Sequence, residues 1–167
     1  MINAFEYQNL NPGATVLRSI DPIVLEKPRA PIHVHTYGGE TPFFKGLTKG
    51  KLMATKCNTK GCPAGDSGEA MLPPRVYCPD CLELMEWVEI KDPEAEIYTH
   101  ISVSYPGAFN RLDPPCHLIS ISIKGVSTVL MSHLKEGEPE IGMKIEPRFN
   151  TYAPTYTILD LWWVPKK

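Results

Sequence analysis

The chain has 167 residues, of which 43% are hydrophobic and 22% charged, and its formal net charge is −2. This length can bury one good core, or one core plus a small metal-stapled segment. No run approaches the roughly 18 apolar residues of a membrane span, and a pI of about 6.2 provides no overall positive field for holding DNA or RNA. We therefore expect a soluble protein. The polar start of the sequence, which has no positively charged apolar leader, predicts a cytoplasmic one.

Residues 1–40 contain four prolines and only brief apolar patches. Such patches bury too little surface to offset the backbone entropy that is lost on ordering. The sequence therefore predicts an extended N-terminal arm, which lies either on its own domain or on a partner.

A short helix is predicted to begin at Thr41. Threonine can cap free backbone N–H groups, and Pro42 is tolerated at the first helical position. Two glycines soon afterwards keep this helix short. We expect Phe43 and Phe44 to anchor it, and a strand over 51–56 to lead into the first cysteines.

Four of the five cysteines form two close pairs, which give the strongest signal in the sequence. Four residues separate Cys57 from Cys62, two separate Cys78 from Cys81, and fifteen lie between the pairs. A zinc ion takes four thiolates at about 2.3 Å, and two short Cys-x(n)-Cys turns, here called the first and second knuckle, usually supply them. The spacing therefore predicts one structural Zn²⁺ per chain. Four thiolates leave no open coordination position for a reacting water.

Two other interpretations of the cysteines stay open. Disulfides would need an oxidising compartment. A redox-active Cys-x-x-Cys motif normally begins a helix within a βαβ unit, whereas Cys78 follows the turn formed by residues 72–75. Residues 63–69 are small, polar and glycine-rich and predict an exposed loop, and the prolines within 71–76 predict a rigid extended segment. This layout is typical of a zinc ribbon.

Beyond the ribbon, apolar residues recur with a period of two, which indicates half-buried strands. The pattern covers 97–105 and 119–123, and Lys124-Gly125 is predicted to turn the chain into a strand over 126–132. Two more strands are predicted at 143–149 and 155–164. In the first strand, one face is expected to hold Ile97, Thr99, Ile101, Val103 and Tyr105.

Five strands of this length fit a small Greek-key barrel of the oligonucleotide/oligosaccharide-binding (OB) type. The sequence thus predicts a mainly β protein with one short helix. Its predicted parts are an extended N-terminal arm (1–40), the helix with a rubredoxin-like zinc ribbon (41–90) and an OB-fold barrel (91–167).

The chain offers no clear catalytic constellation. Cys116 and His117 are adjacent in a predicted strand, so they point to opposite faces and cannot form a hydrogen-bonded dyad. His33 and His35 would share one strand face, but two ligands alone do not make a metal site. We therefore predict no catalytic residues.

Two surfaces are candidates for binding. The lysines and Arg75 around the ribbon form a locally basic region, which is either a solvated face or a site for phosphate groups. In the last strand, Ile158 and Trp162 are expected on one face and Leu159, Leu161 and Trp163 on the other. One face is predicted to join the barrel core, and the other to be covered by the arm or by a partner protein.

A series of spaced motifs runs through the ribbon and the predicted barrel. They are Phe43-Phe44-Lys45-Gly46-Leu47, Gly50-Lys51-Leu52, Cys57, Leu72-Pro73-Pro74-Arg75, Cys78-Pro79-Asp80-Cys81, Trp87 and Ile141-Gly142-Met143. In these motifs the sequence resembles the acyl-CoA-associated zinc-ribbon/OB-fold family, long catalogued only as a domain of unknown function. The resemblance covers residues 41 to about 150 in the family's order. The chain departs from the family in its wide first knuckle and its long N-terminal arm.

Members of this family typically serve as non-catalytic subunits of thiolase-superfamily enzymes, as in benzoylsuccinyl-CoA thiolase and in the archaeal thiolase/hydroxymethylglutaryl-CoA synthase complex. The resemblance implies an accessory subunit that organises a partner's active site or its channel for coenzyme A and substrate. If the chain itself contacts coenzyme A, Lys56 and Arg75 are by their charge the candidates for holding its phosphates.

Two functions of other classes compete with this one. OB barrels and zinc ribbons often bind single-stranded nucleic acid, which requires a basic groove with exposed aromatic residues. The predicted barrel is instead acidic. An autonomous hydrolase or acyltransferase would require turnover by the isolated chain. The acidic residues of the barrel are Asp92, Glu94, Glu96, Glu136, Glu138 and Glu140.

Overall fold

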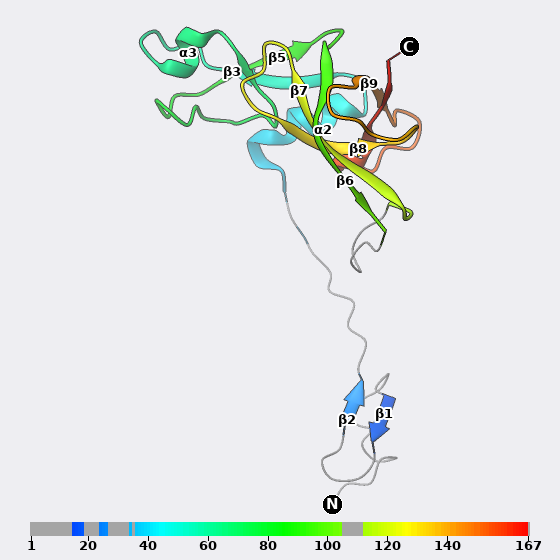
Figure 1. The fold of residues 1–167 in the computed structure, drawn as a ribbon. Coiled ribbons are helices and arrows are strands. Elements are labelled where there is room, and N and C mark those ends of the chain that lie inside the picture. Colours follow the sequence, from blue (N-terminus) through cyan, green and yellow to red (C-terminus); the bar gives the residue numbers. More distant parts are fainter. Residues whose placement is uncertain (1–14, 19–23, 27–33, 35, 105–111, 167) are drawn as a thin grey trace, which may run out of the picture. The chain divides into compact units, whose positions relative to one another are not determined.

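The computed structural model describes residues 15–18, 24–26, 34, 36–104 and 112–166 (Figure 1). The chain divides into two compact units, residues 1–36 and residues 37–167. In the first unit, β1 (Thr15–Arg18) and β2 (Val24–Glu26) pair in antiparallel orientation. Most of the predicted N-terminal arm lies outside the described residues.

The predicted short helix is present and begins where expected. A 3-10 turn, η1 (Gly38–Glu40), runs directly into α2 (Thr41–Leu47). Phe43 is buried and belongs to the main core, and Phe44 packs against that core. The expected capping role of Thr41 is wrong, because its hydroxyl donates a hydrogen bond back to the Gly38 carbonyl oxygen at 2.7 Å.

A three-stranded antiparallel sheet follows the helix. Its central strand β3 (Leu52–Lys56) pairs with β4 (Ala70–Met71) on one side and with β5 (Glu86–Ile90) on the other. The segment between the cysteine pairs is not wholly a loop, because Pro63–Ser67 form a short helix, α3. This helix ends at Gly68, whose φ of +71° is a left-handed conformation that glycine adopts readily.

The remaining strands close into a barrel, which confirms the predicted five-stranded architecture. The strand order around it is β10-β8-β7-β6-β9. Neighbouring strands are antiparallel except β10 and β8, which close the barrel through a parallel contact between Trp163 and Leu134. Its strands are β6 (Ala95–Val103), β7 (Cys116–Ile123), β8 (Leu130–Leu134), β9 (Lys144–Phe149) and β10 (Leu161–Pro165).

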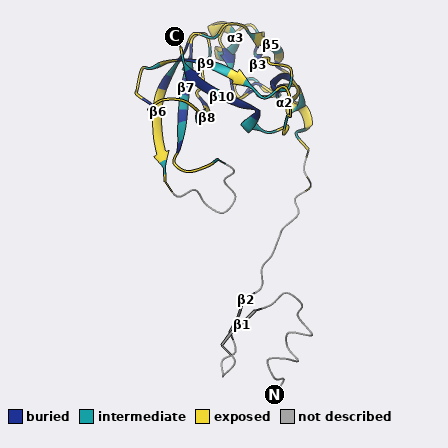
Figure 2. Cartoon of the chain, turned by 90° about the vertical axis from the view of Figure 1, so that its right-hand side faces the viewer, coloured by how far each residue is buried: buried dark blue, intermediate teal, exposed yellow. Residues whose placement is uncertain are grey.

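Strand β6 departs from the predicted alternation. Ile97 is buried as expected, but the pairing register with β7 shifts between Ile97 and Thr99. A β-bulge of this kind changes which face each later side chain occupies. Beyond Ile97 both faces of β6 are exposed, Ile101 to 61%, and Figure 2 shows the exposed end of β6 in yellow.

The last strand begins later than predicted. A 3-10 turn, η2 (Ile158–Asp160), precedes β10, and the carboxylate of Asp160 is fully buried there. This carboxylate accepts hydrogen bonds from the backbone N–H groups of Thr155 and Tyr156 at 2.8 and 2.7 Å and from Asn150 Nδ2 at 3.1 Å. Because Asp160 gathers these donors, residues 150–160 fold into a compact loop instead of extending the strand.

One buried cluster joins the ribbon sheet to the barrel. It includes Phe43 and Leu47 from α2, Leu52 from β3, and Ile121 and Trp163 from the barrel. A separate, smaller cluster contains Cys57, Cys62, Cys78 and Met85. The main core therefore extends across residue 90, where the sequence predicts a boundary between the ribbon and the barrel. That boundary stays a prediction. Among the described residues, no helix is long and apolar enough to cross a membrane.

Candidate metal centre

Each cysteine pair is placed by a tight turn at one end of the ribbon sheet. Cys57 directly follows β3, and Cys62 is the residue before α3. In the second knuckle, the Cys78 N–H donates to the Glu83 carbonyl oxygen at 2.9 Å, and the Leu82 N–H donates to the Cys78 carbonyl oxygen at 2.9 Å. Figure 1 shows α3 and its flanking loops at the edge of the domain, beyond the barrel strands.

The four sulfur atoms converge on one point, with every pair within 4.8 Å. Cys57 Sγ lies 3.8 Å from Cys62 Sγ and 3.7 Å from Cys81 Sγ, and Cys62 Sγ lies 3.7 Å from Cys78 Sγ. A tetrahedron of sulfurs with metal bonds of about 2.3 Å has edges of about 3.8 Å. A disulfide would require a separation of about 2 Å, and all five cysteines are free thiols. The cluster therefore fits a tetrahedral metal ion.

The four-residue gap of the first knuckle does not prevent this convergence. Gly61 adopts a φ of +78°, which reverses the chain just before Cys62. The Cys62 N–H donates to the Thr59 carbonyl oxygen at 3.3 Å, and the Gly61 N–H donates to the Asp66 carboxylate at 3.1 Å. The extra residues are thus taken up by a hydrogen-bonded turn, and α3 then carries the chain away.

The thiols of the cluster differ in acidity. A hydrogen bond from the Glu83 N–H, assisted by the Thr59 side chain, outweighs burial and lowers the pKa of Cys81 to about 7. The Gly65 N–H acts on Cys62 in the same direction, but burial and the neighbouring thiols together raise the pKa of Cys62 to about 12. A bound cation would stabilise all four thiolates, and it would thereby allow the Cys62 thiol to lose its proton at neutral pH.

Gly65 and Thr59 contact sulfur atoms of the cluster, and the sequence pattern did not identify either residue. A Cβ atom at position 65 would lie 2.2 Å from the Thr59 carbonyl oxygen, so only glycine fits without a backbone shift. The N–H of Gly65 can therefore reach the Cys62 sulfur. The glycine between Pro63 and Ser67 was visible in the sequence, but it indicated only an exposed loop and no contact with a cysteine. Contacts of this kind orient ligands and tune metal affinity.

Lys56 and Arg75, the residues expected to contact coenzyme A phosphates, flank the end of β3. Lys56 is the last residue of β3 and lies opposite Glu86 in the register between β3 and β5. The Arg75 backbone N–H donates to the Thr55 hydroxyl at 2.9 Å, and Arg75 is one of the residues that line a cavity of about 360 Å³, together with Phe44. Lys56 does not line that cavity. Their assignment to coenzyme A stays a prediction.

The other candidates from the sequence are dispersed. Cys116 and His117 are consecutive residues of β7, and His117 Nδ1 lies 2.8 Å from the Ser102 hydroxyl of the neighbouring strand. His33 and His35 lie outside the described residues. Within the described parts of the chain, the four cysteines form the only group of three or more potential ligand side chains whose ligand atoms converge.

No family model matches the sequence, and the search of curated proteins likewise gives no match. Solved structures do match. A protein of unknown function from the DUF35 family of Sulfolobus solfataricus is 23% identical with a TM-score of 0.56, and the match covers 78% of this chain and 87% of that one. A structure named Ltp2-ChsH2(DUF35) aldolase is 20% identical with a TM-score of 0.57, and the match covers 75% of this chain and 93% of that one. These likenesses establish that the chain has the fold of DUF35 proteins.

Proposed function

We propose that this chain is a zinc-binding, non-catalytic subunit of a thiolase-superfamily acyl-CoA enzyme complex. In this role it organises the partner's active site or the channel through which coenzyme A and substrate pass. The observation that carries the proposal is the combination of a four-cysteine cluster with a closed OB-type barrel, in a fold shared with DUF35 proteins.

The named aldolase structure adds independent support. That structure is named as an aldolase that combines a DUF35 protein, ChsH2, with a second component, Ltp2. A DUF35 fold thus occurs beside a partner in an enzyme. The family resemblance of residues 41–150 suggests a thiolase-superfamily protein as the corresponding partner here.

The geometry of the cluster favours a structural metal. Three of the four cysteines are buried, and four sulfur ligands complete a tetrahedron without a position for substrate. A tetrahedral set of four sulfurs selects zinc, or iron as the main alternative. We propose zinc, one ion per chain, and metal analysis of protein purified without added metal tests this: clearly less than one zinc per chain, or stoichiometric iron in its place, contradicts it.

Partner binding is tested by co-expression with the thiolase-superfamily proteins of the same organism, followed by affinity capture and size-exclusion chromatography. A stoichiometric complex is expected, and Cys78→Ser should abolish it. Cys116→Ser is the matched control, because Cys116 lies in β7 and outside the cluster, and it should leave the complex intact.

Activity measurements separate the proposal from an autonomous enzyme. The isolated chain should not release coenzyme A from acyl-CoA substrates, whereas the complex should. Turnover by the isolated chain, or failure of every thiolase-superfamily protein of that organism to co-purify, would contradict the proposal.

The acidic barrel argues against the alternative of single-stranded nucleic-acid binding. Two barrel-side lysines that could contact phosphates are held by carboxylates: Lys124 lies 3.1 Å from Glu94, and Lys144 pairs with Glu96 at 2.5 Å. These pairs reduce the positive field that a polyanion requires. Micromolar, salt-dependent binding to an oligo-dT probe would revive the alternative.

A further inference from the structure

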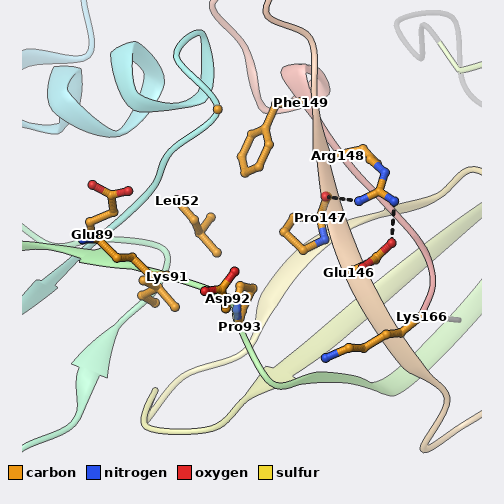
Figure 3. Close-up of a pocket in the computed structure, with 12 residues that line it drawn as sticks. Leu52, Glu89, Lys91, Asp92, Pro93, Glu146, Pro147, Arg148, Phe149 and Lys166 are labelled. Carbon is orange, nitrogen blue, oxygen red and sulfur yellow. Dashed lines mark hydrogen bonds and ion pairs between the residues drawn. The ribbon is translucent and has the colours of Figure 1, made fainter.

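A cavity of about 590 Å³ lies between the ribbon sheet and the barrel, at the end of β3 opposite the knuckles. Figure 3 shows the residues around it. They come from four stretches that are distant in the sequence: Gly50 and Leu52 before and in β3, residues 89–93 at the end of β5 and in the turn after it, residues 146–149 of β9, and Lys166 after β10. Neither Lys56 nor Arg75 belongs to it.

One part of the cavity wall is apolar and includes an aromatic ring. Phe149 is half-buried and packs against the main core to which Leu52 belongs. Pro93 and Pro147 add rigid apolar surface with no backbone N–H group. In Figure 3 the Phe149 ring and Leu52 face the same open space. Such a wall suits a flat apolar body, which can pack against the ring.

The charged residues of the cavity are not equivalent, because two carboxylates are already paired. Glu89 accepts a hydrogen bond from Lys51 Nζ at 2.9 Å, and Glu146 pairs with the Arg148 guanidinium. The hydrogen bond with Lys51 lowers the pKa of Glu89, so this carboxylate stays ionised.

Two cations remain available in the cavity. In the part of the chain that the structure describes, the ammonium groups of Lys91 and Lys166 take part in no hydrogen bond or ion pair. Figure 3 shows the Lys166 ammonium group extending toward the turn at Asp92 and Pro93. The exposed carboxylate of Asp92 is the one remaining anion among the lining residues.

We propose that this cavity binds an aromatic phosphate monoester, a ligand class that includes nucleotides. The phosphate carries a charge of about −1.5 to −2 at neutral pH and is matched by two free ammonium groups, while the ring packs against Phe149. The cavity is large enough for such a ligand, since ligand sites typically span about 300–1,000 Å³. This inference goes beyond the proposed function and stands without a partner protein.

The test uses the isolated, metal-loaded chain and two-dimensional ¹⁵N NMR titration with phenyl phosphate, inorganic phosphate and phenol as probes. Phenyl phosphate should give saturable shifts at the amides of Gly50, Asp92 and Phe149. It should bind more tightly than either fragment, because only the whole molecule uses both the ring wall and the lysines.

Variants separate the two contributions. An exposed ion pair changes an affinity by about two- to fivefold, so Lys91→Ala combined with Lys166→Ala should weaken phenyl phosphate binding about tenfold. Asp92→Asn removes the opposing charge and should strengthen binding about two- to fivefold. Phe149→Leu should weaken phenyl phosphate severalfold but leave inorganic phosphate unchanged, since it alters only the ring wall.

Lys124→Ala is the matched control, because this lysine is paired with Glu94 outside the cavity; it should bind phenyl phosphate as the unmodified chain does. The proposal is overturned if no saturable shifts appear, if the shifts map elsewhere, or if the double lysine variant binds unchanged. Each of these outcomes would leave the proposed partnership untouched, because the titration contains no partner.

Discussion

Removing the metal should open the two knuckles and leave the rest of the domain folded. In the structure the knuckles contribute only a small buried cluster, in which Met85 is the one large apolar side chain fully buried with the cysteines. Burying a methionine contributes about 1.5–3 kcal/mol, whereas ordering a residue costs about 1–2 kcal/mol of backbone entropy. Over some twenty knuckle residues the entropy cost dominates, and binding of the proposed metal, worth about 10 kcal/mol or more, would offset it.

The main core does not depend on the metal in the same way. Among the residues that the structure describes, it contains sixteen buried ones, from α2, the ribbon sheet, Leu72 and the barrel. Between the knuckles, residues 70–72 are held to the barrel: Leu72 N–H donates to the Thr128 hydroxyl at 2.9 Å, and Ala70 N–H donates to the Gly125 carbonyl oxygen at 2.9 Å. This short segment should stay ordered although knuckle residues flank it on both sides.

Hydrogen exchange followed by mass spectrometry measures this pattern directly. After treatment with a zinc chelator under reducing conditions, protection at residues 57–68 and 76–85 should fall on the order of a hundredfold or more. Protection at 70–72, β7 and β10 should be retained. The reasoning is refuted if the knuckles keep their protection, or if the barrel loses protection together with them.

Three further results are expected. Gly65→Ala forces a Cβ atom against the Thr59 carbonyl oxygen and should lower zinc affinity about ten- to a hundredfold, as measured by competition with a chromophoric chelator. Asp160→Asn replaces an acceptor of several hydrogen bonds with a group that is partly a donor, and should lower the free energy of unfolding by about 2–4 kcal/mol in urea denaturation. Burial and the nearby Lys135 lower the pKa of His133 below its usual 6.5, so protonation favours the unfolded chain. The stability that His133 contributes is complete above pH 6.5 and declines as the pH falls toward its folded-state pKa, and His133→Gln should flatten this decline.

Each expectation has a matched control. Ser67→Ala lies in the same helix as Gly65 and should bind zinc normally. Asp113→Asn changes an exposed carboxylate and should leave stability within about 0.5 kcal/mol. His100→Gln removes an exposed histidine of β6 and should keep the pH dependence of the unmodified chain. If a control behaves like its test variant, the proposed cause of the effect is wrong.

The cysteine cluster could be predicted from the sequence because its ligands lie in two local turns. Spacing within a turn is fixed by a few residues, so Cys57, Cys62, Cys78 and Cys81 were identified correctly as a group that could hold a metal ion. The barrel was predicted from alternation over 97–105 and 119–123, together with three further strands expected after them. Alternation, however, assumes regular pairing, and the bulge near Thr99 of β6 breaks that assumption.

Features that depend on distant contacts could not be predicted. The delayed start of β10 results from Asp160 collecting donors that begin ten residues earlier, at Asn150. The cavity at Phe149 joins Lys91 and Lys166, which lie 75 residues apart in the sequence. Nothing in the local pattern around either lysine distinguishes it from an ordinary solvated side chain.

If the knuckles unfold locally, the partner-binding test also shows where on the chain the partner binds. If the barrel remains folded in Cys78→Ser, as the shared core predicts, loss of the partner cannot be attributed to global unfolding. Loss would then place the interface at the knuckles, where Tyr77, Leu82 and Leu84 are exposed. Retained binding with open knuckles would place it on the barrel instead, and the metal would then stabilise a part of the fold that the partner does not contact.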